Sequence, residues 1–170
     1  MKKLAIIASL LLAVVALTAC NDKKEEVVPE PSAIDKAIDG VWHLQSFAGE
    51  QPSASGLDIY IKFSKLGTFV IYQKGANHVR YVKLDGTFVT ATTSADNVYT
   101  ISGVYSSGEA WGNVYSLTID SEHQQLTLAN NAEASDVSIY AREEYIPASV
   151  LANLAADSRA EGEEEIVPFL

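Results

Sequence analysis

The sequence predicts an all-β fold, an antiparallel up-and-down barrel of eight or nine strands with a short C-terminal helix. Apolar and polar residues alternate with a period of two over short runs, most clearly in 57–64, which is the pattern of a half-buried strand. Turn-forming residues (Gly, Asp, Asn and Ser) separate these runs every few residues. A two-sheet sandwich has a similar pattern, but a closed barrel leaves no exposed strand edge, so we favour the barrel.

Nine runs have the composition of strands. They occupy 40–47, 57–64, 68–74, 78–84, 87–92, 98–106, 114–120, 124–128 and 136–142. Asp85-Gly86 lies between the fourth and fifth runs and predicts a tight hairpin, because Asp-Gly suits the two-residue turns that join antiparallel strands. If every run is a separate strand, the barrel has nine.

Helices are expected only at the two ends of this domain. Residues 32–39 have the composition of a short helix that leads into the first strand. Pro147 fits the first position of a second helix, where its missing N–H is not needed. That helix, over 148–160, places an apolar stripe against the barrel wall, formed by Val150, Leu151, Leu154 and Ala155. The apolar residues 166–170 follow an acidic stretch and have no predicted place.

Residues 1–19 have the pattern of a secretory signal. Lys2 and Lys3 form a basic start, residues 4–15 are almost wholly apolar, and small residues precede Cys20. The apolar run is too short to span a bilayer comfortably, which takes about 20 residues. We therefore divide the chain into a signal peptide (1–19), an anchor and linker (20–37), a barrel domain (38–147) and a C-terminal helix with an acidic tail (148–170).

Residues 17–20, Leu-Thr-Ala-Cys, resemble the lipobox of bacterial lipoproteins. The resemblance implies cleavage before Cys20 and a diacylglycerol thioether on its sulfur, so that acyl chains such as palmitate hold the mature protein to a membrane. Stable anchoring takes more than one chain, and a lipoprotein carries two or three. Cys20 is the sole cysteine, which excludes an intramolecular disulfide. The alternative is an ordinary signal peptide with a chance cysteine.

Charged residues bear on localisation and partners. Residues 24–26, Lys-Glu-Glu, resemble a tag that directs some Gram-negative lipoproteins to the cell surface, which favours the outer membrane and surface exposure. Asp22, close behind the cysteine, resembles an inner-membrane retention signal of other bacteria, so both locations stay open. The net charge is −10, and losing the two signal-peptide lysines makes it −12. So acidic a chain is not expected to bind nucleic acid.

Gly40-Val41-Trp42, at the head of the first strand, is similar to the G-x-W signature of lipocalins. In that family the tryptophan plugs the closed end of an eight-stranded barrel, and a basic residue late in the barrel packs across its ring. The resemblance implies that Trp42 and Arg142 form this barrel-closing pair through a cation–π contact.

A second stretch, 103–147, resembles the later half of lipocalin-like lipoproteins of Gram-negative bacteria. The similar residues are Tyr105, 111–113, Tyr115, 126–128 and 140–147. With the G-x-W signature the resemblance covers about 38–147. The sequence lacks the Thr-Asp-x-x-Tyr motif and the disulfide of animal lipocalins, which leaves their receptor-binding roles unsupported.

No catalytic constellation stands out in the sequence. His43, His78 and His123 occur singly, without the ligand spacing of a zinc site. Glu143 and Glu144 are adjacent on a strand and therefore point to opposite faces. A nucleophile elbow and a phosphate-binding loop are also absent from the sequence. We therefore expect no enzyme, no metal and no cofactor.

Aromatic residues of the predicted strands are the remaining functional lead. The candidates to line the interior are Phe63, Phe69, Tyr81, Tyr99, Tyr105 and Tyr115. Barrels of about eight strands either fill with side chains or hold one small ligand. A cavity would make the protein a binding module for a small apolar ligand. A filled interior would make it an interaction module that docks an envelope protein partner, and the sequence leaves both open.

Overall fold

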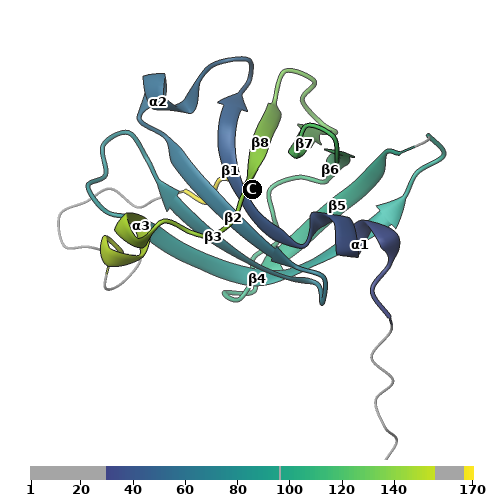
Figure 1. Cartoon of the computed structure of the whole chain (residues 1–170). Coiled ribbons are helices and arrows are strands. Elements are labelled where there is room, and N and C mark those ends of the chain that lie inside the picture. Colours follow the sequence, from purple (N-terminus) through teal and green to yellow (C-terminus); the bar gives the residue numbers. More distant parts are fainter. Residues whose placement is uncertain (1–29, 96, 156–166) are drawn as a thin grey trace, which may run out of the picture.

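The computed structural model describes residues 30–95, 97–155 and 167–170, so the predicted signal peptide (1–19) and Cys20 lie outside the described residues. Its strands form one closed barrel in which each strand pairs antiparallel with the next along the chain, and the last pairs with the first (Figure 1). The strands are β1 (Gly40–Phe47), β2 (Asp58–Ser64), β3 (Thr68–Lys74), β4 (Val82–Thr92), β5 (Tyr99–Tyr105), β6 (Tyr115–Asp120), β7 (Gln125–Asn130) and β8 (Val137–Glu143). This confirms the predicted fold class and sets the strand number at eight.

The predicted hairpin at Asp85-Gly86 is wrong. Strand β4 runs through both residues as one strand of 11 residues, with its first half paired to β3 and its second half to β5. Gly86 lies at a close approach of β4 to β5, since a Cβ there would collide with the backbone oxygen of Val104. A glycine inside a strand often marks such an approach rather than a turn.

Alternation along the strands sends one apolar face into the barrel. On β2 the side chains of Ile59, Ile61 and Phe63 are almost completely buried in the main core cluster. Tyr60 lies between them on the outer face, in a second cluster that is formed by Val41, Tyr60, Tyr81 and Val150. The period of two read from the sequence therefore separates the inside of the barrel from the outside.

Helix α1 (Ala33–Ile38) closes one end of the barrel and confirms the helix predicted before β1. Ser32 caps its N-terminus, with the Ser32 hydroxyl and the Asp35 carboxylate each bonding to the other residue's backbone N–H. Ile34 and Ile38 turn inward and join the main core cluster. A second short helix, α2 (Pro52–Ser55), follows β1 and so lies toward the opposite end, where the barrel has its mouth (Figure 1).

Helix α3 (Ala148–Ala152) begins after Pro147, as predicted, but is shorter than expected, and residues 156–166 lie outside the described residues. It packs on the outer wall of the barrel (Figure 1). Val150 belongs to the second cluster, and Leu154, just beyond the helix, packs against that cluster. Leu151 was expected in the same stripe but is 47% exposed, because a helix this short turns only one narrow face to the wall.

Candidate functional site

The barrel end next to α1 is closed by Trp42. Its side chain is fully buried, and its indole Nε1 donates a hydrogen bond of 2.7 Å to the backbone oxygen of Ile38. The Arg142 guanidinium lies over the indole ring, 4.3 Å from its centroid. Its two terminal nitrogens also donate to the backbone oxygens of Ala37 and Asp39, at 2.7 and 2.9 Å. These hydrogen bonds hold the C-terminal end of α1 against the barrel, and the Trp42 and Arg142 side chains fill the closed end.

A cluster of aromatic side chains fills the barrel interior from Phe69, which pairs with Phe63 near the β2–β3 turn, up to the mouth ends of β5 and β6. Phe69 meets Tyr105 and Trp111 edge to face, with ring centroids 5.6 and 5.1 Å apart, and Tyr115 lies beyond Trp111 at 6.3 Å. Trp111 comes from the loop between β5 and β6 and folds inward over Gly103, where any Cβ would collide with the indole ring. A loop residue thus completes the inner wall. We define the mouth cluster as Phe69, Tyr105, Trp111 and Tyr115.

The six candidate lining residues fall into three places. Phe69, Tyr105 and Tyr115 belong to the mouth cluster. Phe63 packs on Phe88 at 5.1 Å near the closed end, and half-buried Tyr99 lies beside the start of α1.

Tyr81 does not line the interior. It immediately precedes β4, and its ring packs on the outer wall with Val41, Tyr60 and Val150. Its backbone pairs with residues just after α3, so the chain is tied there to the outside of the barrel. The sequence run 78–84 suggested a strand that would carry Tyr81 inward, but β4 begins only at Val82.

A short segment from the far end of the chain, Val167–Leu170, enters the mouth. The side chain of Leu170 is 4% exposed and belongs to the main core cluster. The hydroxyl of Tyr105 donates a buried hydrogen bond of 2.7 Å to the backbone oxygen of Leu170. Phe169 rests edge-on against Phe47 of β1, with ring centroids 5.0 Å apart.

Gln73 of β3 holds the same segment by both ends of its side-chain amide. Its nitrogen donates to the backbone oxygen of Val167 at 2.8 Å, and its oxygen accepts from the backbone N–H of Phe169 at 3.0 Å. Gln73 is only 4% exposed, so this pairing satisfies an amide that would otherwise be buried without partners.

The tyrosine hydroxyls of the barrel interior are available as hydrogen-bond donors, and that of Tyr105 donates to the backbone oxygen of Leu170. Burial raises the pKa of Tyr105, Tyr115 and Tyr140 above the ordinary value of 10.0, so their hydroxyls keep their protons. The buried indole Nε1 of Trp111 is a further donor, and it has no acceptor among the described residues. The mouth is therefore apolar in its walls and rich in donors.

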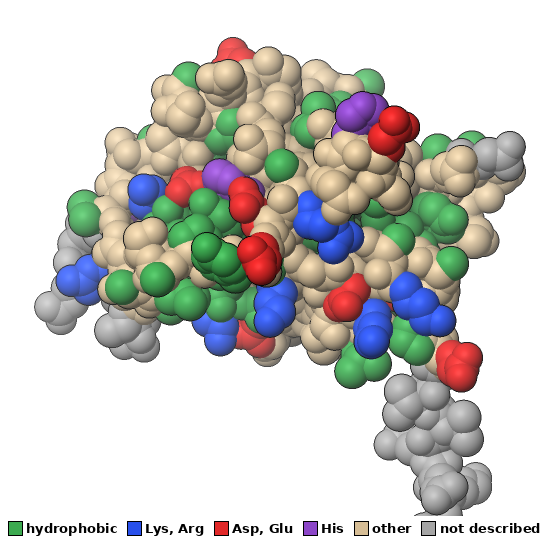
Figure 2. Space-filling view, viewed as in Figure 1, with side chains coloured by type: hydrophobic (Ala, Val, Ile, Leu, Met, Phe, Trp, Pro, Cys, Tyr) green, Lys and Arg blue, Asp and Glu red, His purple; other side chains and the backbone are tan. Residues whose placement is uncertain are grey.

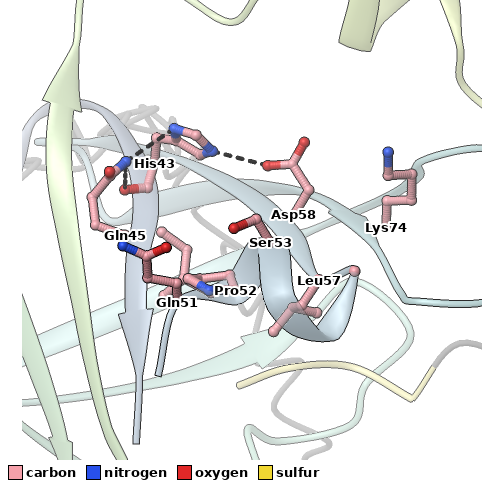
Figure 3. A pocket seen from close by; sticks show the side chains of 10 residues that line it. His43, Gln45, Gln51, Pro52, Ser53, Leu57, Asp58 and Lys74 are labelled. Carbon is pink, nitrogen blue, oxygen red and sulfur yellow. Dashed lines mark hydrogen bonds and ion pairs between the residues drawn. The ribbon is translucent and has the colours of Figure 1, made fainter. Parts of the chain in front are cut away.

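A second candidate region is a pocket of about 540 Å³ on the outer surface beside α2 (Figure 3). Its polar wall contains His43 and Asp58, joined by a hydrogen bond of 2.9 Å, and the Tyr81 hydroxyl donates to the other Asp58 oxygen. His43 also contacts the Gln45 amide at 3.1 Å through its other ring nitrogen and stacks on Tyr60. Both ring nitrogens of His43 already have hydrogen-bond partners in Asp58 and Gln45. The imidazole therefore links the residues of the pocket wall and leaves neither nitrogen open toward a substrate.

The interactions of Asp58 with His43 and Tyr81 are expected to contribute to the free energy of unfolding, and this contribution is expected to be lost at acidic pH. Burial alone would raise the pKa of Asp58, but hydrogen bonds from His43 and Tyr81 and the nearby charge of Lys74 lower it below the ordinary value of 3.8. The contribution is therefore complete well above pH 3.8 and disappears as the pH falls through the lower, folded-state pKa. Asp58→Asn should reduce the acid-induced loss of unfolding free energy, by less than about 1 kcal/mol for a partly exposed group. Urea titrations between pH 7 and pH 3 measure it, and an unchanged difference between the two pH values would contradict the assignment.

The described residues contain no candidate metal centre. They include no group of three or more His, Cys, Asp or Glu side chains that could hold a metal ion. None of the helices in 30–95, 97–155 and 167–170 has the length and apolar character needed to cross a bilayer.

Sequence reasoning gave no role in the barrel interior to Gln73, Trp111 or the Val167–Leu170 segment. In the sequence Gln73 is an ordinary polar residue near the end of a strand. Its side chain can bind the Val167–Leu170 segment only because it points into the barrel. Trp111 had a usable signal in Gly103, because a glycine within a strand often accommodates a bulky neighbour. The sequence signal for the Val167–Leu170 segment was weaker: an apolar run that follows an acidic stretch is expected to bury its side chains against another part of the protein.

Comparisons with protein-family models, with curated proteins and with solved structures found no match to this chain. The conclusions below therefore rest on the barrel, on the mouth cluster and on the motifs of the sequence.

Proposed function

We propose that this protein is a lipid-anchored lipoprotein of the cell envelope whose lipocalin-like barrel binds a small, mainly apolar ligand in its mouth. The closed eight-stranded barrel is compatible with the lipocalin resemblance. So is the position of Trp42 under Arg142 at one end, which leaves the other end as the place for a ligand.

One observation supports binding most strongly: the mouth combines apolar walls with buried polar groups that face an occupant. Phe69 and Trp111 provide aromatic surface, while the Tyr105 hydroxyl and the Gln73 amide bond to the backbone of Val167–Leu170. A ligand that is mainly apolar with one polar, accepting end would match both features.

The anchor and the location are proposed from the sequence alone. The lipobox-like residues 17–20 support acylation of Cys20, and the charged, proline-bearing stretch behind it would separate the barrel from the bilayer. We propose the outer membrane as the location, with surface exposure supported by Lys-Glu-Glu at 24–26.

The binding test is a titration with a fluorescent fatty acid of the mature chain, made soluble by Cys20→Ser. Trp111→Phe removes part of an aromatic contact and an indole donor from the mouth, and should weaken binding about threefold to tenfold. Trp42→Phe is the matched control, because it alters the same residue type at the closed end and should leave the affinity unchanged. Circular dichroism checks that both variants fold.

No binding by the chain, either with or without its Val167–Leu170 segment, would reject the proposal. An equal loss in the two tryptophan variants would place the ligand away from the mouth.

The second candidate function is docking of an envelope protein partner. Its support is the dense interior, where Val167–Leu170 already occupies the mouth. An outer groove of about 690 Å³ also runs along the wall near α3, with Val41, Tyr72, Ile146 and Leu151 in its lining. Figure 2 shows hydrophobic side chains gathered on this side of the molecule, bordered by charged ones. Failure of the fatty-acid titration would favour this function.

A further inference from the structure

The Val167–Leu170 segment is not a strand of the barrel. The eight strands close on one another without it, through the pairing of β1 with β8. Its hydrogen bonds to the barrel come from the side chains of Gln73 and Tyr105. Among the described residues, no backbone-to-backbone hydrogen bond joins it to a strand. The segment can therefore leave without breaking the sheet.

The pairing with Gln73 shows what kind of group the mouth accepts. One amide bonds to the backbone oxygen before Pro168 and to the backbone N–H after it, which is bidentate recognition of an extended peptide. Pro168 has no N–H of its own, so no donor of that residue needs a partner. Departure of the segment would leave the buried Gln73 amide and Tyr105 hydroxyl in need of new partners.

The apolar side chains of the segment occupy the space where an apolar ligand would bind. Leu170 is buried in the same cluster as the aromatic residues of the mouth, and Phe169 contacts Phe47 at the rim. Val167 differs, because its side chain is 78% exposed and faces away from the barrel. Leu170 and Phe169 thus provide the apolar contact, and the backbone provides the polar contact.

We propose that Val167–Leu170 is a displaceable internal occupant of the mouth, so that this segment and the ligand exclude one another. The inference rests on the proposed function and adds its regulation, because the ligand must displace the segment to bind. Covalent attachment gives such a segment an effective concentration in the millimolar range, which makes even a weak four-residue contact a strong competitor.

The test compares four forms of the mature Cys20→Ser chain in the fatty-acid titration: the parent, a chain ending at Ile166, Leu170→Asp and Val167→Asp. Loss of the segment, or a charge on its buried leucine, should tighten binding of the probe at least about tenfold. Val167→Asp introduces the same charge on an exposed side chain of the same segment and should bind like the parent. The peptide Val-Pro-Phe-Leu, added at millimolar concentration, should displace the probe from the shortened chain.

The two proposals fail in different ways. Equal, measurable affinity in all four forms would overturn the internal occupant and leave the proposed function standing. A probe that the peptide cannot displace from the shortened chain would also overturn it. Absence of binding by all four forms would overturn the proposed function, and the inference with it.

Discussion

Trp42→Ala is expected to lower the free energy of unfolding by about 3–5 kcal/mol, the range measured for other buried large-to-small changes. The indole is fully buried, and its removal opens a void at the closed end of the barrel. The change also leaves the Ile38 oxygen without its donor and Arg142 without the ring beneath it. Chemical denaturation of the mature Cys20→Ser chain, followed by circular dichroism, measures the loss.

Val89→Ala is the control for this measurement. Its side chain is 68% exposed, so its truncation should change the free energy of unfolding by no more than about 0.5 kcal/mol. A loss below roughly 1 kcal/mol for Trp42→Ala would show that the closed end does not depend on the tryptophan.

Cys20→Ser is expected to abolish membrane attachment of the full precursor. Serine offers no sulfur for the thioether, so the chain should carry no diacylglycerol and should partition into the aqueous phase of a detergent separation. Metabolic labelling with a palmitate analogue should then give no signal for the variant. Asn21→Ala, which keeps the cysteine and residues 17–20, is the control and should label like the parent. A labelled Cys20→Ser chain would disprove the anchor assignment.

Local pattern was sufficient to predict antiparallel strands that bury one face and expose the other, and the barrel was favoured over a sandwich because closure leaves no strand edge exposed. The alternation in 57–64 reappears as the inward row of Ile59, Ile61 and Phe63. The prediction failed at Asp85-Gly86, where the same dipeptide fits a turn or a crowded strand. Only the neighbouring strand decides between them, and its position is a long-range property that a local pattern does not contain.

The candidate site was predicted only in part, for the same reason. Trp42 could be singled out because it lies at the head of the first strand, and Tyr105 and Tyr115 followed from alternation. Trp111 and Leu170 reach the mouth from a loop and from beyond β8, so no period of their own segments places them there. Gln73 shares the inward register of β3, but the value of a buried amide depends on the segment that it binds.

The most direct test of binding in the mouth uses the two tryptophans as reporters. The chain has only two, so nitrogen-15 labelling gives two indole N–H resonances, one from each end of the barrel. Trp111 lies in the mouth cluster, whereas the Trp42 indole is fixed by its bond to Ile38. Titration of the chain ending at Ile166 with a fatty acid should shift the Trp111 resonance and leave that of Trp42 in place. A stationary Trp111 resonance at saturating fatty acid, or a shift of Trp42 alone, would contradict binding in the mouth.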